Sequence, residues 1–248
     1  MDIVLEKADD FKKCIDSIAV LIDEAEFIFD GNGLSLRATD PSQISMVDFF
    51  LKKESFKKFE LDGKTKLGLD LDYFGQIMSR AKAGDELHLA LESDKNYLSV
   101  TFNGSSVRKF SMPLIDISTS ELPSPKIDFD AELSMKASVL QDALKDSALI
   151  STHVSLGVEN KKFFVKAHSS KGELNSQTEK GDKAITEMTV KGEAKSMFPL
   201  DYLSDMLKTA SSDTDVKVFL KSNAPIQVNY KVGAADITYF LAPRIESE

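Results

Sequence analysis

Residues 117–128 read Ile-Ser-Thr-Ser-Glu-Leu-Pro-Ser-Pro-Lys-Ile-Asp, with Pro123 and Pro125 separated by a single residue. Proline fixes φ, removes a backbone N–H donor and favours an extended preceding residue, so this stretch favours neither a helix nor an inner strand. Its apolar residues, such as Leu122 and Ile127, follow neither helical nor alternating spacing. The stretch therefore predicts a linker, and it divides the chain of 248 residues near its midpoint.

Composition limits the class of protein. Apolar residues make up 42% of the chain and charged residues 29%, which is typical of a protein with real cores and a soluble surface. No apolar run approaches the ~20 residues of a membrane span, and the opening MDIVLEKADDF lacks the pattern of a secretory signal. The single cysteine, Cys14, favours a reducing compartment. A net charge of −9 excludes a surface that is basic throughout, but it allows a local basic surface.

The first half alternates helical and strand periodicities. Asp9 or Asp10 is a candidate cap for a helix that runs to about Asp23, and a second helix is predicted over 71–83. The second helix is predicted to have an apolar side formed by Tyr73, Phe74, Ile77, Met78 and Ala81. Strand-like runs are predicted at 3–5, 26–29, 34–38, 45–51, 64–69, 86–91, 97–102 and 107–112.

The second half has the same organisation. Ser138 is a candidate cap for a helix to about Ile150, with Gln141, Asp142 and Lys145 on its polar side, and a further helix is predicted over 200–210. Strand-like runs are predicted at 131–135, 154–158, 162–167, 185–190, 216–220, 226–232 and 236–241.

Short motifs recur between the halves. Leu71-Asp-Tyr-Phe returns as Leu200-Asp-Tyr-Leu, 129 residues further along (71 to 200), and Leu34-Ser-Leu-Arg-Ala matches Phe163-Phe-Val-Lys-Ala at the same separation. A period this long is not that of a solenoid. The sequence therefore predicts a duplicated α+β domain with mainly antiparallel pairing.

Motifs for catalysis are missing. The sequence has no Gly-rich loop followed by Lys-Ser/Thr, no Gly-x-Gly-x-x-Gly after a strand and no Gly-x-Ser-x-Gly elbow. His88, His153 and His168 stand apart from one another and from any cysteine at metal-ligand spacing. Asp40 and Asp48 are a conceivable pair of metal ligands, but no third ligand lies at metal-ligand spacing from them. Cys14 is interpreted as a small core residue.

Basic residues recur on or beside the outer faces of all the predicted helices. They are Lys12, Lys13, Arg80, Lys82, Lys145 and Lys208. An ordinary solvated helix surface is the alternative, and Asp16, Asp142 and Asp205 dilute the pattern. Because the chain is acidic overall, basic residues at related helices indicate faces that meet phosphates.

Several motifs together resemble a known family. The tail Tyr239-Phe-Leu-Ala-Pro-Arg-Ile-Glu246 is similar to the YLAPKIE tail of the DNA sliding clamps of archaea and eukaryotes, the proliferating cell nuclear antigen (PCNA) family. Leu34-Ser-Leu-Arg-Ala-Thr-Asp-Pro-Ser42 followed by Gln-Ile-Ser-Met46 supports the resemblance. So do Gly172-Glu-Leu174 and Pro225-Ile-Gln-Val-Asn-Tyr230. These motifs occur in the family's order around a linker in the family's place.

The resemblance implies the DNA clamp fold: two similar α+β clamp domains, 1–116 and 129–248, joined by the linker 117–128. Helices are expected on one face and mainly antiparallel sheets on the other. Three copies are expected to close head to tail into a homotrimeric ring around duplex DNA, with the six basic residues in sequence-independent contact with phosphates. The ring would hold a DNA polymerase on DNA as a processivity factor, without catalysis, cofactor, metal or membrane. Its location would be the cytoplasm of an archaeon or the nucleus of a eukaryote.

The resemblance also implies a partner site. DNA polymerase, nuclease, ligase and an ATP-driven clamp loader are expected to bind through short motifs with apolar and aromatic anchors. The matching positions are Gln43, Ile44, Met46, Leu122, Pro225, Phe240, Leu241, Ala242 and Pro243. The alternative is that these residues close an interdomain core. The subunit contact is expected to join an edge strand near Val107–Met112 to one near Glu173–Thr178.

Two rival functions stay open at this point. A ring edge can prefer a different neighbour, so the chain is also compatible with one subunit of a heterotrimeric clamp for replication or damage signalling. A small hydrolase with an unrecognised carboxylate or histidine site is the rival from a different class. The mass of the protein in solution separates the first rival from a homotrimer.

Overall fold

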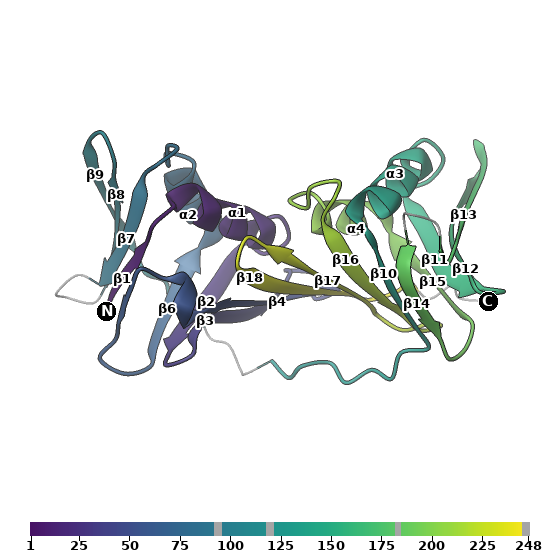
Figure 1. Cartoon of the computed structure of the whole chain (residues 1–248), viewed down its shortest axis with the longest axis horizontal. Helices are drawn as coiled ribbons and strands as arrows, with labels where there is room; N and C mark the ends of the chain where they lie inside the picture. Colours follow the sequence, from purple (N-terminus) through teal and green to yellow (C-terminus); the bar gives the residue numbers. More distant parts are fainter. Residues whose placement is uncertain (92–95, 118–121, 182–184, 245–248) are drawn as a thin grey trace. The chain divides into compact units, whose positions relative to one another are not determined.

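The computed structural model describes residues 1–91, 96–117, 122–181 and 185–244. It consists of two compact units (Figure 1). Unit 1 contains Met1–Gln43, Val47–Pro123 and Val232–Ile237, and unit 2 contains Ile44–Met46, Ser124–Lys231 and Thr238–Glu248. Each unit combines helices with antiparallel strands, which confirms the predicted α+β class.

Unit 1 is built from two sheets and two longer helices in its described part. Its elements are β1 (Asp2–Leu5), α1 (Ala8–Ala19), β2 (Glu24–Asp30), β3 (Gly33–Thr39), β4 (Ser45–Lys52), the 3-10 helix η1 (Lys53–Ser55), β5 (Lys58–Glu60), β6 (Thr65–Asp70), α2 (Leu71–Met78), β7 (Glu86–Leu91), β8 (Tyr97–Asn103) and β9 (Val107–Pro113). One sheet has the order β5-β1-β7-β8-β9, and β4, β3, β2 and β6 are successive neighbours in the other. Strand β9 is therefore an edge strand.

Unit 2 repeats this plan. Its elements are β10 (Ala131–Lys136), α3 (Ala137–Ala148), β11 (His153–Glu159), β12 (Lys162–Ser169), β13 (Gly172–Glu179), β14 (Ile185–Val190), β15 (Ala194–Pro199), α4 (Leu200–Met206), β16 (Asp215–Leu220), β17 (Ile226–Val232) and β18 (Ala235–Leu241). A four-stranded sheet has the order β13-β12-β11-β15, and β14, β10, β16, β17 and β18 are successive neighbours in another. Strand β13 is an edge strand of the four-stranded sheet, as is β15 at its other end.

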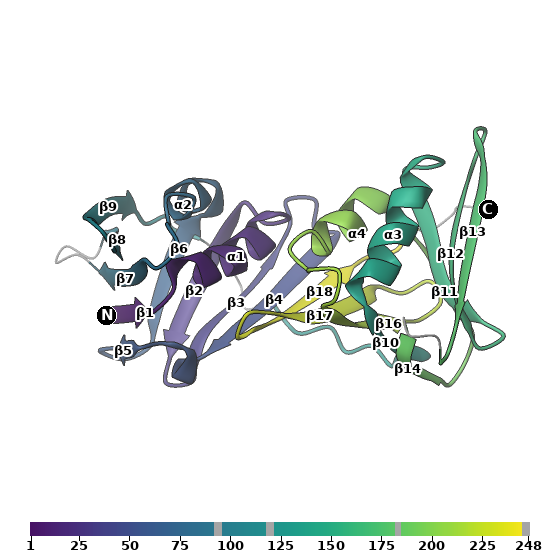
Figure 2. The same ribbon diagram turned by 45° about the horizontal axis from the view of Figure 1, so that its top comes forward.

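Helices α2 and α4 begin at the repeated motif. The first starts at Leu71 and the second at Leu200, so the Leu-Asp-Tyr repeat marks equivalent helix starts in the two halves. In each unit the two helices lie side by side on one face of the sheets (Figures 1 and 2). The duplicated sequence thus encodes a duplicated layer arrangement.

The core of unit 1 is aromatic where its helices meet its sheet. Phe74 of α2 lies edge-on to Phe11 of α1, with ring centroids 6.4 Å apart, and edge-on to Phe27 of β2 at 6.2 Å. All three side chains are at most 2% exposed. Tyr73, predicted on the same apolar side as Phe74, is instead 41% exposed. Successive helical residues point about 100° apart, so burial of Phe74 leaves Tyr73 at the margin of the apolar face.

The predicted caps of α1 and α3 were wrong. The N-cap of α1 is Lys7, so Asp9 and Asp10 lie inside its first turn. Their carboxylates stabilise the helix there because the N-terminal end of the helix dipole is positive. The N-cap of α3 is Lys136 rather than Ser138. Each helix follows a strand within a few residues, and the extended chain at the cap position sets the start without a capping side chain.

Helices α1, α2 and α4 end before their predicted ends at Asp23, Ala83 and Ala210. At the end of α1 the Leu21 N–H donates to the Ile18 carbonyl at 3.2 Å, a three-residue turn that closes the helix.

Strands β5 and β15 lie in segments for which no strand was predicted. Strand β5 has only three residues, and in β15 the buried Ser196 and the partly exposed Met197 hide the alternation of apolar and polar residues.

The linker is anchored at each end to its own unit. Arg37 Nη1 donates to the Leu122 carbonyl at 2.9 Å in unit 1. In unit 2 Lys191 Nζ donates to the Asp128 carboxylate at 3.0 Å, and Lys221 Nζ to its carbonyl at 2.8 Å. Residues 122–128 form neither helix nor strand, as predicted, and the linker residues 118–121 lie outside the described residues.

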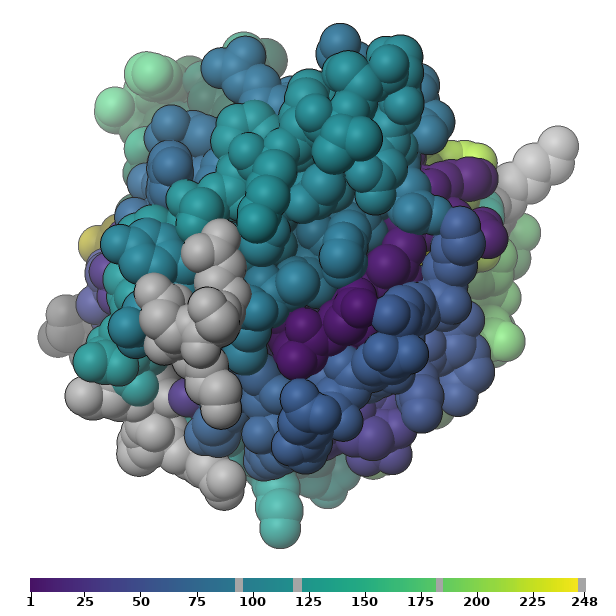
Figure 3. Space-filling view, turned by 90° about the vertical axis from the view of Figure 1, so that its left-hand side faces the viewer, coloured from purple at the N-terminus to yellow at the C-terminus, as the bar shows by residue number. Residues whose placement is uncertain are grey.

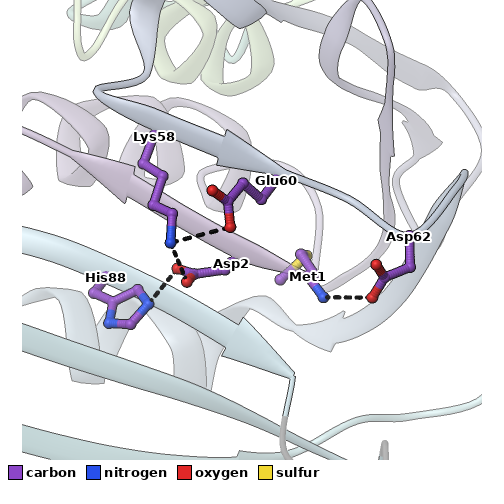
Figure 4. A network of polar contacts seen from close by, with 6 residues as sticks. All are labelled: Met1, Asp2, Lys58, Glu60, Asp62 and His88. Atoms are coloured by element: carbon purple, nitrogen blue, oxygen red, sulfur yellow. Dashed lines mark hydrogen bonds and ion pairs between the residues drawn. The ribbon is translucent and has the colours of Figure 1, made fainter.

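In the five-stranded sheet of unit 1, β1 lies between β5 and β7 (Figure 3). A polar network joins these three strands (Figure 4). Asp2 accepts from Lys58 Nζ at 2.6 Å, and its other oxygen lies 2.6 Å from His88 Nε2. The hydrogen bond from Lys58 lowers the pKa of Asp2, and His88 adds to the effect. A carboxyl with a lowered pKa stabilises the folded state at neutral pH, and this contribution is lost as the pH falls through the lowered pKa.

Candidate nucleic-acid and partner interfaces

Lys12 and Lys13 lie on the outer side of α1, opposite its buried face. Phe11, Ile15 and Ile18 are buried at helical spacing, which turns the two lysines outward. Each is held within its own helix: Lys12 by Asp16 one turn on, and Lys13 by Asp10 at 3.3 Å. Exposed pairs of this kind contribute little, so the ammonium groups can exchange their carboxylate partners for phosphates.

Arg80 and Lys82 were predicted on the polar side of a helix, and they lie instead in the loop after α2. The loop is folded around the buried carboxylate of Asp85, which accepts the Lys82 N–H at 2.8 Å. Arg108 of β9 pairs with Asp85 and donates to the Arg80 carbonyl at 2.5 Å. Both basic side chains stay exposed. These two hydrogen bonds fix the backbone from which the side chains project.

Asp85 and Arg108 were not found by sequence reasoning. The side chain of Asp85 is 5% exposed and that of Arg108 is 24% exposed. Gly104 leaves room for the pair, because a Cβ at this position would lie 1.9 Å from Asp85 Oδ1. The single signal in the sequence is the Asn-Gly turn between β8 and β9, which indicates a hairpin but not what lies beneath it.

Unit 2 carries Lys145 on α3 and Lys208 just beyond the end of α4. Lys145 pairs with Asp142 at 3.2 Å, with both side chains largely exposed. Helix α4 was predicted to reach Ala210, but it ends at Met206. Gln141, predicted to face solvent, turns inward and donates to the carbonyls of Leu207 and Ala210 at 3.0 and 2.9 Å. This amide fixes the segment from which Lys208 projects.

Asp205 is the acidic neighbour of Lys208. Partial burial raises the pKa of Asp205, and the charge of Lys208 opposes this effect. The Lys208 N–H donates to the Asp205 carbonyl at 3.1 Å, which places the two residues in one turn. Each unit therefore presents basic side chains on its helical side, accompanied by carboxylates that reduce the local positive charge.

Most of the predicted partner positions lie in unit 2. Ile44 and Met46 are partly exposed, as are Pro225, Ala242 and Pro243. The Ala242 N–H donates to the Ile44 carbonyl at 2.8 Å, which brings the segment after β18 beside the segment before β4. The other predicted positions are Phe240, which is 7% exposed, Leu241, which is fully buried, and Gln43 and Leu122, which belong to unit 1.

The candidate metal pair does not form a site. The Asp48 carboxylate pairs with the guanidinium of Arg37, and the Asp40 carboxylate accepts the Ser42 N–H at 3.0 Å. Among the described residues, no group of three or more His, Cys, Asp or Glu side chains is placed to hold a metal ion. Cys14 is 4% exposed, and burial raises the pKa of its thiol to about 12. No helix in the described part of the chain is long and apolar enough to span a membrane.

Comparison with known proteins gives matches along nearly the whole chain. The family model of the proliferating cell nuclear antigen N-terminal domain matches residues 1–122, and that of the C-terminal domain matches residues 124–245. The DNA polymerase sliding clamp of Methanococcus maripaludis is 36% identical over 245 residues, which cover 96% of each chain. DNA polymerase sliding clamp 1 of Thermococcus kodakarensis is 33% identical over 99% of this chain and 98% of its own.

Solved structures are similar in the same way. The crystal structure of PCNA from Thermococcus kodakaraensis superimposes with a TM-score of 0.92 at 26% identity, covering 98% of this chain and 99% of that one. The PCNA of A. fulgidus, solved with the C-terminal region of FEN-1 bound, superimposes with a TM-score of 0.88 at 29% identity. That match covers 100% of this chain and 99% of the other.

Proposed function

The chain belongs to the proliferating cell nuclear antigen family of DNA sliding clamps, and from that membership we propose that three copies close head to tail into a ring around duplex DNA. The ring acts as a processivity factor that tethers DNA polymerase without catalysing a reaction. The observation that carries the proposal is the presence of both clamp domains in one chain, at nearly the full length of its relatives. Those relatives come from archaea, which supports the archaeal cytoplasm as its location.

Two edge strands support a head-to-tail ring. Strand β9 ends the five-stranded sheet of unit 1, and β13 ends the four-stranded sheet of unit 2. An edge strand presents unpaired N–H and C=O groups that can join another chain. Pairing β9 of one copy with β13 of the next is a heterologous contact, which makes a ring when the rotation closes.

The mass of the purified protein in solution tests the ring. We expect light scattering after size exclusion to give three times the chain mass of 27.4 kDa, independent of dilution through the micromolar range. A stable monomer would contradict the homotrimer and would favour the heterotrimeric alternative. In that case a second, non-identical chain is needed to restore the trimer mass.

The basic residues of the helical sides are proposed to contact DNA. Lys12, Lys13, Arg80, Lys82, Lys145 and Lys208 are the residues concerned. Ammonium and guanidinium groups that pair with phosphates bind without reading the base sequence, as sliding requires. The carboxylates of Asp16, Asp10 and Asp142 weaken the contacts of Lys12, Lys13 and Lys145, which suits a protein that must move along its ligand.

Charge reversal at Lys12, Lys13 and Lys208 to Glu is expected to weaken binding of the protein to a short linear duplex DNA. Each lost phosphate contact lowers the slope of the logarithm of the binding constant against the logarithm of the salt concentration by about one. The control reverses Lys57, Lys66 and Lys191, which lie in strands or loops and pair with carboxylates. Equal effects of the two triple variants would contradict the assignment, because they would indicate general electrostatics.

Partner proteins are proposed to bind beside Ile44, Met46 and the segment Phe240–Pro243. The partly exposed apolar side chains and the Ile44–Ala242 hydrogen bond provide a rigid apolar surface for an aromatic anchor. The nine positions that the family resemblance implies are together proposed as the partner site. DNA polymerase, nuclease, ligase and the clamp loader are the expected partners, each using a short peptide motif. The FEN-1 segment bound to the A. fulgidus relative supports this mode.

Replacing Ile44 and Met46 by Ala is expected to weaken binding of a FEN-1 C-terminal peptide about tenfold or more, since buried anchor contacts contribute about 1–2 kcal/mol each. Isothermal titration calorimetry measures the change. Leu149→Ala, which removes an apolar side chain that is 75% exposed in unit 2, is the control. Unchanged affinity in the double variant, with its solution mass intact, would refute this location of the site.

A further inference from the structure

A hollow lies on the four-stranded sheet of unit 2, on the face opposite α3. Its volume is about 880 Å³, and it is lined by β11, β12, β13, β15 and Arg244. Helix α3 packs on the other face of the same sheet, where Val154, Leu156 and Val165 are buried. Alternate residues of a strand point to opposite faces, so the neighbours of these residues line the hollow.

Strand register explains why the surface is hollowed. Ser155 of β11 lies opposite Lys166 of β12 on one side and Met197 of β15 on the other. Gly157, two residues along β11, lies between Phe164 and Lys195. The middle strand thus contributes short residues and its neighbours long ones. Directly opposed residues share a face, so the short residues form the floor and the long ones the walls.

Two lysines stand on the walls. The Lys166 ammonium lies 4.3 Å from the centroid of the Phe164 ring. The same ammonium nitrogen lies 3.4 Å from Oε2 of Glu159. Lys195 of β15 is exposed, and it is paired with Gly157 on the side of β11 away from β12. The ring of Phe164 reaches across Gly157, where a Cβ would meet it at 2.5 Å. The ring thereby supports the Lys166 ammonium above the floor.

Arg244 supplies a third cation through a backbone bridge. Its N–H donates to the Met197 carbonyl at 2.7 Å, so it extends the cross-strand row that runs through Lys166, Ser155 and Met197. The guanidinium lies 3.2 Å from Nε2 of His153. The tail is thus fixed with a positive group beside the hollow.

The charge of the hollow is opposite to that of the chain. Its lining includes Lys166, Lys195 and Arg244, with Glu173 as the carboxylate among its lining residues and His153 and His168 as titratable neighbours. The ion pairs found within residues 1–91, 96–117, 122–181 and 185–244 include neither Lys195 nor Arg244. In a chain with a net charge of −9, such a cluster is a local basic surface that attracts anions.

We propose that this hollow binds an acidic segment of a partner protein, whose carboxylates pair with Lys166, Lys195 and Arg244. The volume suits several residues of peptide rather than a single ion. Single-stranded nucleic acid requires exposed aromatic faces for base stacking, and Phe164 is only 2% exposed. Duplex DNA is excluded from the hollow because the proposed function places it on the opposite, helical side. This exclusion rests on the proposed function, whereas the acidic partner segment goes beyond it.

Fluorescence anisotropy of a labelled hexaglutamate peptide tests the proposal with the full chain at low salt. Wild type is expected to bind it, and Lys195→Gln with Arg244→Gln is expected to weaken binding about tenfold, because the variant loses two ion pairs with the peptide. Lys191→Gln with Lys217→Gln, the same charge change elsewhere in unit 2, is the control and is expected to change affinity less than about twofold. Ser155→Leu fills the floor without changing charge and is expected to weaken binding as well.

Several results would overturn the proposal. They are failure of the wild type to bind the peptide, equal losses in the two charge variants, and full binding by the Ser155→Leu variant. Tighter binding of an oligothymidylate, lost in the same variants, would assign the hollow to nucleic acid instead. Solution mass and melting temperature of each variant establish that it is folded. None of these outcomes depends on the clamp encircling DNA, so failure here leaves the sliding-clamp function untouched.

Discussion

Replacement of Arg108 by Ala is expected to lower the free energy of unfolding by about 3–5 kcal/mol, because it leaves a buried carboxylate without its charged partner. The Asp85 side chain is 5% exposed, and it would keep the Lys82 N–H as a donor. The variant also loses the donor to the Arg80 carbonyl and the guanidinium that lies 5.2 Å from the Phe102 ring. Urea denaturation followed by circular dichroism measures the change.

Lys145→Ala is the control for this prediction. It breaks an ion pair with Asp142 in which both side chains are at least 70% exposed, so we expect a loss within about 0.5 kcal/mol. A loss for Arg108→Ala as small as that of the control would show that water reaches Asp85 freely. The same variant should also release the loop that carries Arg80 and Lys82. Faster amide exchange at 79–85 is the expected sign.

Phe74→Ala is expected to cost about 3–5 kcal/mol, the range for removing a fully buried phenylalanine. Its ring is 1% exposed and lies edge-on to Phe11 and Phe27, so its removal takes a shared neighbour from α1 and β2 at once. The cavity would lie where the helices meet the sheet of unit 1. The midpoint of the urea transition is the measurement.

Tyr73→Ala provides a matched control one residue away on the same helix. Because Tyr73 is 41% exposed, we expect a change within about 0.5 kcal/mol. Equal costs at the two positions would contradict the placement of the apolar face of α2. They would favour the sequence-based interpretation, in which both residues faced inward.

Periodicity predicted the strands and the inner helix faces because both arise from burial on one side of a regular element. Phe11, Ile15 and Ile18 recur at helical spacing and are buried together. The alternation in β3 and β4 follows inward and outward positions in the same way. The repeated Leu-Asp-Tyr motif marked two helix starts because equivalent folds reuse equivalent signals.

Helix ends were predicted less well because tertiary contacts set them. The chain after α2 turns to offer the Lys82 N–H to Asp85, and the segment after α4 is held by Gln141, a residue about sixty positions earlier. Gln141 is far in sequence from the end that it fixes, and Asp85, although near Lys82, is itself held by Arg108 of β9. The positions of Arg80, Lys82 and Lys208 beyond their helices follow from this.

The proposed sites differ in how much of them the sequence reveals. Short motifs place Ile44 and Phe240–Pro243 by resemblance, without any knowledge of the fold. The hollow of unit 2 depends on register, which sets Ser155 between Lys166 and Met197, and on a tail that brings Arg244 beside them. A shift of one residue in that register would send these side chains to the opposite face, so no linear pattern contains the site.

The two edge strands also carry opposite charge. Strand β9, Val-Arg-Lys-Phe-Ser-Met-Pro, contains Arg108 and Lys109 and no acid, whereas β13, Gly-Glu-Leu-Asn-Ser-Gln-Thr-Glu, contains Glu173 and Glu179 and no base. Two identical edges that met would bring like charges together, while unlike edges would bring opposite charges together. In the proposed ring, this difference in charge would disfavour assembly in the wrong polarity. The strands that would pair there would then also discriminate between right and wrong neighbours.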